Sequence, residues 1–200
     1  LDEVVEEKLT RARRRSDEAI ELINNVLKIS KLRIEDSFIK EEVDIASILA
    51  RAIKSAKVNA EAKGVKLSLI NHRKEKHTIE GDPLLIQIAL SNIISNAIKY
   101  NNMDGIVEIE VDEDKDNLII KVCDNGVGIP KEETEKIFND FYRASNIKHS
   151  SVEGSGLGLS VVKQIVERHN GTINVQSPSH LSTNKYPGTC IKITLPFLKK

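Results

Sequence analysis

Three polar side chains within one apolar stretch offer the first sign of chemistry in this sequence. Asn92, Asn96 and Lys99 recur at helical spacing, which places them on one face of a helix whose other face is apolar. An amide oxygen suits a Mg²⁺ ion that already carries phosphate oxygens, and an ammonium group neutralises phosphate charge. The pattern indicates a site for a metal and a phosphate chain. For an isolated helix, however, a solvated polar face is the commoner explanation.

A first glycine-rich turn runs from Asp124 to Pro130, directly after an apolar segment that alternates like a strand. We expect the Asp124 carboxylate to point out of the sheet edge, where it can accept a hydrogen bond from an exocyclic amine such as that of adenine. Gly126 and Gly128 let the backbone approach a ligand closely. An Asp-Asn-Gly turn is also ordinary loop chemistry, so this turn alone leaves both interpretations open.

A second glycine-rich turn precedes an apolar helical segment. A helix N-terminus flanked by glycines offers backbone N–H groups and a positive dipole end to phosphates. A flexible linker is the alternative for this turn on its own. No strand immediately precedes it, which argues against a dinucleotide fingerprint, and the absence of Gly-Lys-Ser/Thr argues against a P-loop. The expected phosphate contacts are Gly154, Ser155, Gly156, Leu157 and Gly158.

The joint occurrence of these segments, in this order, resembles the catalytic ATP-binding domain of two-component sensor histidine kinases, with its N, G1, F and G2 boxes. The resemblance implies that Asn96 holds Mg²⁺ and that Asp124 reads adenine with support from Thr189. It implies catalytic roles for Asn92, Lys99 and Arg143. Besides the second turn, the other implied contacts of ATP are Tyr100, Gly126, Gly128, Ile129 and Phe141.

The segment between the two turns matches the F box through Phe138, Phe141, Tyr142 and Arg143. A polar stretch over residues 144–153 follows without apolar periodicity, and we predict a mobile lid that closes over ATP. Arg143 is expected to reach the γ-phosphate during transfer. An ordinary polar surface loop is the alternative interpretation of the same stretch.

The reaction is expected to be phosphoryl transfer to a protein. Related ATPases place a Glu one turn before the metal-binding Asn, as the base for the attacking water, and this chain has Asn92 there. Because an amide cannot accept that proton at useful pH, hydrolysis should be slow. Two alternatives stay open: a regulatory or scaffold module that binds a nucleotide without transfer, and a Ser/Thr kinase of the anti-sigma-factor type.

The phosphate acceptor departs from the resembled pattern. None of the five histidines lies in the usual His-Glu/Asp-x-x-Thr/Asn-Pro setting, and residues 1–40 contain no histidine. Those residues resemble the second dimerisation helix instead. We therefore expect the acceptor on a helix missing from this chain, and no autophosphorylation of the isolated chain on the usual histidine.

Periodicity predicts one long amphipathic helix from residue 1 to about residue 34, then a linker and an alternation of helices and strands. We expect residues 1–40 to form a partial dimerisation and phosphotransfer helix with its linker, and residues 41–200 the catalytic domain. The predicted fold is a two-layer α/β sandwich with a mixed sheet, of the Bergerat type, preceded by a helical arm. Predicted helices span 46–63, 84–100, 132–138 and 156–169; predicted strands span 65–71, 77–80, 106–112, 117–123, 172–176 and 189–195.

Composition and charge limit the partners. Thirty basic and thirty acidic residues cancel, which gives no bulk field for nucleic acid or an anionic membrane, so we expect neither as a partner. The short apolar runs predict a cytoplasmic segment without membrane contact, in a parent protein that can itself be anchored. The unpaired stripe of the arm predicts packing against a helix of the same chain or of another one, as in dimerisation or bundling. The resemblance implies a homodimer of the parent through this arm and a response regulator receiver domain as partner.

The two cysteines, Cys123 and Cys190, lie in separate apolar segments. Their spacing fits neither a disulfide framework nor a zinc motif. We expect two reduced core thiols without a chemical role.

Overall fold

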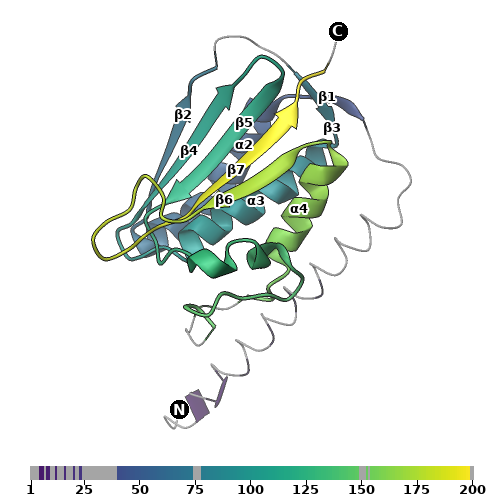
Figure 1. Ribbon diagram of the computed structural model, residues 1–200. Helices are drawn as coiled ribbons and strands as arrows, with labels where there is room; N and C mark the ends of the chain where they lie inside the picture. Colours follow the sequence, from purple (N-terminus) through teal and green to yellow (C-terminus); the bar gives the residue numbers. More distant parts are fainter. Residues whose placement is uncertain are drawn as a thin grey trace.

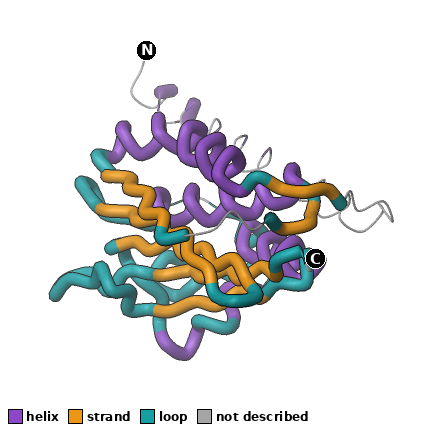
Figure 2. The backbone as a smooth tube through the Cα atoms, turned by 90° about the horizontal axis from the view of Figure 1, so that it is seen from above, coloured by secondary structure: helices purple, strands orange, loops and turns teal. Residues whose placement is uncertain are grey.

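The computed structural model describes residues 40–73, 78–148, 152 and 154–198, together with eight separate helical positions between residues 5 and 23. The predicted arm lies largely outside the described residues, so its pairing stays a prediction. In the described part a β-sheet forms one layer and three helices pack on one of its faces (Figures 1 and 2). Among these residues, no helix has both the length and the apolar character needed to cross a membrane.

The main sheet has five strands in the order β2-β4-β5-β7-β6. β2 pairs in parallel with β4, and all other neighbours are antiparallel, so the sheet is mixed as predicted. A separate two-stranded antiparallel sheet joins β1 and β3, and β1 was not predicted. The bounds are β1 Glu41–Val43, β2 Lys66–Asn71, β3 Ile79–Gly81, β4 Ile106–Glu113, β5 Asn117–Asp124, β6 Thr172–Gln176 and β7 Cys190–Pro196.

The helices begin and end where local chemistry directs them. They are α2 (Ile45–Lys63), α3 (Pro83–Lys99) and α4 (Gly158–Arg168). The Asp44 side chain accepts a hydrogen bond from the N-terminus of α2, and Asp82 accepts two from that of α3. Such caps set the residue at which each helix begins and therefore which side chains lie on its polar face.

The predicted helix over 132–138 is wrong. Two separate 3₁₀ turns occupy this segment, η1 (Lys131–Glu133) and η2 (Lys136–Phe138). Only Ile137 is buried in them. A segment of this length without an apolar stripe gains too little from packing to sustain an α-helix.

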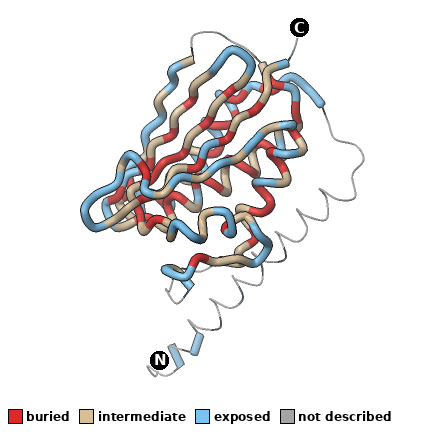
Figure 3. Tube along the Cα trace, in the orientation of Figure 1, coloured by how far each residue is buried: buried red, intermediate tan, exposed pale blue. Residues whose placement is uncertain are grey.

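The core lies between the sheet and the helices (Figure 3). Inward side chains alternate along the central strands, as Val107 and Ile109 do in β4 and Ile120 and Val122 do in β5. α3 crosses the middle of the layer and buries one apolar face against them. The other face of α3 carries Asn92, Asn96 and Lys99 and is turned toward the loops between α3 and α4.

Candidate nucleotide-binding site

One cavity collects nearly all the predicted site residues. It lies between α3, the N-terminus of α4 and the ends of β5 and β7, under the segment that follows η2. Of the predicted residues, those that line it are Asn92, Asn96, Lys99, Tyr100, Asp124, Gly128, Ile129, Arg143, Gly154, Ser155, Gly156, Gly158 and Thr189. Segments that are up to 97 residues apart in sequence therefore share one site.

The polar face of α3 forms one wall of this cavity. Asn92, Asn96 and Lys99 all line it, while Ile93 and Ile94 are buried. The Nδ2 atom of Asn92 is buried and has no hydrogen-bond partner among the described residues. Leaving a buried amide donor unsatisfied costs about 1–3 kcal/mol, which a ligand with acceptor oxygens would recover. This wall therefore fits a phosphate chain.

The second glycine turn lies directly against that wall. A Cβ atom built on Gly158 would be 3.7 Å from Asn92 Oδ1 and 3.8 Å from Asn96 Nδ2. One built on Gly154 would be 3.1 Å from Lys99 Nζ and 3.2 Å from Tyr100 Oη. α4 begins at Gly158 without a side-chain cap, so the positive end of its dipole and its N-terminal N–H groups lie near the α3 amides and without a side-chain partner at the cap. This is the arrangement predicted for anionic oxygens.

Asp124 lies at the end of β5, buried with 6% of its surface exposed. Its Oδ1 atom accepts hydrogen bonds from the N–H of Gly126 at 2.8 Å and from the N–H of Thr189 at 3.2 Å. Burial raises the pKa of this carboxyl to about 6, and the two backbone donors act in the opposite direction. Thr189, the residue directly before β7, thus supports Asp124 through its backbone.

Three predicted contacts do not line the cavity: Gly126, Leu157 and Phe141. Gly126 packs against the backbone at the end of α3, and Leu157 is 1% exposed in the core. The Phe141 side chain is 66% exposed, and its backbone packs against Gly156, whose φ is +74°. Contacts between ATP and these three residues stay predictions, since the structure gives each a place outside the cavity lining.

The described part of the predicted lid is tied down by hydrogen bonds. Arg143 Nη2 donates to the carbonyl oxygens of Ile147, at 3.2 Å, and Val152. Asn146 Nδ2 donates to Gly128 O at 3.0 Å, which links this segment to the first glycine turn. The Arg143 Nε atom is buried without a partner among the described residues. Arg143 thus organises the segment that covers the cavity, and its contact with a γ-phosphate stays a prediction.

The apolar part of the cavity wall was not recognised from the sequence. Val122 and Ile191 contribute from the sheet, and Ile137, Ala144 and Ile147 from the covering segment. Such a wall suits the flat faces of a base. The strand residues have the periodicity of ordinary core positions, so nothing in their pattern distinguishes a ligand-facing side chain from a buried one.

The described histidines lie outside the cavity. His169 is buried beside the N-terminus of α3: its Nδ1 contacts Ile165 O at 2.7 Å, and its Nε2 accepts from Asp82 N at 2.9 Å. Desolvation by burial lowers the pKa of His169. These contacts give His169 a structural role. His77 and His149 lie outside the described residues.

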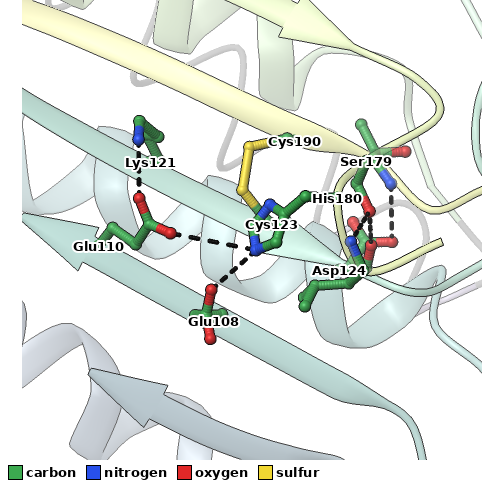
Figure 4. Close-up of a disulfide and its surroundings, with 10 residues drawn as sticks. Glu108, Glu110, Lys121, Cys123, Asp124, Ser179, His180 and Cys190 are labelled. Atoms are coloured by element: carbon green, nitrogen blue, oxygen red, sulfur yellow. Dashed lines mark hydrogen bonds and ion pairs between the residues drawn. A yellow bond between two sulfur atoms is a disulfide. The ribbon is translucent and has the colours of Figure 1, made fainter. Parts of the chain in front are cut away.

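The prediction of two reduced, separate thiols is wrong. Cys123 in β5 and Cys190 in β7 are directly opposite each other and form a disulfide, 67 residues apart in sequence (Figure 4). Sequence spacing gave no sign of this pair because the register of two non-consecutive strands creates it.

The mixed sheet, the helices on one face and the cavity define an ATP-binding domain of the Bergerat type. A profile of the family described as histidine kinase-, DNA gyrase B- and HSP90-like ATPase matches residues 81–199. The chain belongs to this ATPase family, and its curated relatives are sensor histidine kinases. The sensor protein kinase WalK of Staphylococcus aureus is 34% identical over 200 residues, which cover 98% of this chain and 46% of that sequence.

Solved structures agree with this assignment. The mycobacterial sensor histidine kinase MprB superposes with a TM-score of 0.68 at 28% identity, over 81% of this chain and all of that one. The histidine kinase ThkA, solved in complex with the response regulator TrrA, has the same fold: its TM-score is 0.72 at 21% identity, over 92% of this chain and 49% of that chain. The chain spans less than half the length of the curated relatives it matches.

Proposed function

We propose that this chain is the ATP-binding catalytic part of a sensor histidine kinase, and that it transfers the γ-phosphate to a histidine on a dimerisation helix outside this chain. One observation carries the proposal. A single cavity joins the amide face of α3, the uncapped N-terminus of α4 and the buried carboxylate of Asp124. Anion-binding and amine-reading groups that line one cavity match the phosphate chain and the base of ATP.

We assign each site residue a separate role in this proposal. Asp124 accepts a hydrogen bond from the adenine amine while Gly126 and Thr189 hold the carboxylate in place. The N–H groups at the start of α4 bind phosphate oxygens, and Lys99 neutralises their charge. Asn96 would hold Mg²⁺, because its amide lines the cavity beside Gly158 and offers a hard neutral oxygen. When bound, that ion supplies charge neutralisation for the transfer.

Asn92 favours transfer over hydrolysis. Its side chain lies on the cavity wall one turn before Asn96, and its amide cannot take a proton from water. With no carboxylate at this position, a water molecule beside the γ-phosphate is not activated. The role of Asn92 in the proposal is to donate its orphaned Nδ2 hydrogen bond to the phosphate chain.

The organisation of the parent protein follows as part of the same proposal. Residues 1–40 supply part of the dimerisation hairpin of a homodimer, and residues 41–200 the catalytic domain. A response regulator receiver domain is the partner we propose, by analogy with the ThkA complex. We place the segment in the cytoplasm, where ATP and receiver domains are available.

A reconstitution in trans tests the proposed transfer. The chain is mixed with γ-labelled ATP, Mg²⁺ and a separate helical hairpin that carries the parent's acceptor histidine. We expect alkali-stable, acid-labile phosphate on the hairpin, and none when the acceptor is changed to Gln or when Asn96 is changed to Ala. Acid-stable phosphate on Ser or Thr would overturn the histidine assignment. Intact nucleotide binding without transfer would instead support a scaffold module.

A further inference from the structure

The face of the sheet opposite the helices carries a row of side chains that the nucleotide site does not use. Glu108 in β4 pairs with Cys123 in β5, and Cys123 pairs with Cys190 in β7. Directly opposed residues of antiparallel neighbours project from the same face of a sheet. Because Val107, Val122 and Ile191 beside them belong to the helix-covered core, this row points away from the helices.

A loop between β6 and β7 places a histidine over the row (Figure 4). His180 Nε2 lies 2.8 Å from Glu108 Oε1 and 4.0 Å from Glu110 Oε1. A ring nitrogen of His180 and both cysteine sulfurs lie within 4.8 Å of one another. The neighbouring Ser179 donates from Oγ to Asp124 O at 2.7 Å, which fixes the loop in this position.

We propose that the reduced form of this cluster binds a thiophilic divalent cation, with Zn²⁺ as the best match, through Cys123, Cys190 and His180. Two thiolates and one imidazole are the donors that zinc selects, and three protein ligands leave a fourth tetrahedral position. Glu108 touches His180 and is opposite Cys123, so it is the carboxylate that lies beside this set of ligands. Glu110 is already paired with Lys121 at 2.7 Å.

The binding step requires reduction of the Cys123–Cys190 bond. A cellular dithiol is oxidised to its own disulfide as the two cysteines take up its two electrons and two protons. Binding of Zn²⁺ then releases the two thiol protons and leaves two metal-bound thiolates. The carboxylate of Glu108 adds negative charge beside His180, which favours a cation at this place.

This site is distinct from the nucleotide cavity, which none of the three proposed ligands lines. The proposal therefore does not depend on kinase activity. The ligands come from two strands and a loop, so the spacing of the cysteines in sequence resembles no zinc motif. Only the register of β5 against β7 brings the two cysteines together.

Titration with Co²⁺ alone, as a spectroscopic stand-in for Zn²⁺, tests the proposal. The chain is kept reduced with a phosphine, which does not compete as a thiol. We expect one equivalent of Co²⁺ to produce thiolate charge-transfer absorption and the strong visible bands of tetrahedral cobalt, both abolished by added Zn²⁺. The same chain with its disulfide intact should show neither.

Variants separate binding by all three ligands from binding by the two thiols alone. His180→Ala should weaken Co²⁺ binding by at least ~10-fold, and Cys190→Ser should remove most of the charge-transfer band. His72→Ala, at an exposed histidine beyond the end of β2, should change neither. Circular dichroism confirms that each variant is folded. The proposal is overturned if the reduced, folded chain gives no charge-transfer band, or if His180→Ala binds Co²⁺ as tightly as the parent chain.

Discussion

Replacing Asp124 by Asn exchanges a single heavy atom, a carboxylate oxygen for an amide nitrogen, in the part of the site that reads the base. In the structure, Oδ1 accepts from two backbone donors, the N–H groups of Gly126 and Thr189. The amide has one oxygen and one NH₂ group. If the oxygen faces the backbone donors, the NH₂ faces the adenine amine, and the opposite rotamer sets NH₂ against the backbone donors. Either way a donor faces a donor.

The size of the effect follows from this geometry. Asp124 is buried, so the bond between its carboxylate and an adenine amine is shielded from water. A hydrogen bond to a charged group is worth about 1.5–3 kcal/mol. We therefore expect Asp124→Asn to weaken binding of an ATP analogue by roughly 10-fold to 150-fold. A triphosphate with hypoxanthine as its base lacks the amine, so its affinity should change much less.

Calorimetric titration with a non-hydrolysable ATP analogue and with its hypoxanthine counterpart measures both effects. Asp116→Asn, at an exposed position in the turn that joins β4 to β5, provides a matched control and should bind like the parent chain. The reasoning is refuted if Asp124→Asn, shown to be folded, binds the ATP analogue within threefold of the parent. An equal loss for both nucleotides would also refute it, because the amine would then not be the group that Asp124 reads.

Three further changes test other parts of the structure. Asn96→Ala should bring the ratio of dissociation constants without and with Mg²⁺ close to one in the same titration; an unchanged ratio would place the ion elsewhere. Gly156→Ala should lower the free energy of unfolding by about 1–2 kcal/mol or more, because its φ is +74° and the new Cβ would lie 2.6 Å from the Phe141 carbonyl carbon. Gly154→Ala, whose Cβ would meet only side-chain ends, should cost less in urea unfolding. His169→Gln should reduce the loss of folding stability below pH 6.5. Because the pKa of His169 is lowered in the folded state, the stability that the neutral ring contributes is present above the unfolded-state pKa and is lost as pH falls through the folded-state pKa. The loss is at most ~1.4 kcal/mol per pH unit. Equal slopes for the parent and the Gln variant would contradict the assigned role of His169.

Much of the fold was predictable because its signals are local. The cap at Asp82 and the proline at the start of α3 determine where that helix begins and therefore the direction of its polar face. Alternating apolar positions identified β4 and β5 as a hairpin. The glycine turns at Asp124 and Gly154 were recognisable for the same reason, since each motif lies within a few residues.

What could not be predicted depends on distant parts of the chain. The bond between Cys123 and Cys190 follows from pairing of β5 with β7, which no local pattern specifies. The strand β1, which pairs with β3, has only three residues, too few for a periodic signal. Phe141 is exposed and has a backbone φ of 62°, an uncommon conformation that composition does not reveal.

A structure of this chain with AMPPNP and Mg²⁺ tests the central claim most directly. We expect adenine against Asp124, with its amine within hydrogen-bond distance of the carboxylate. We also expect the phosphates between the amides of Asn92 and Asn96 and the N-terminus of α4, with the metal at Asn96. A nucleotide bound outside this cavity, or bound within it with its phosphates at Asp124 and its base at α4, would contradict the account.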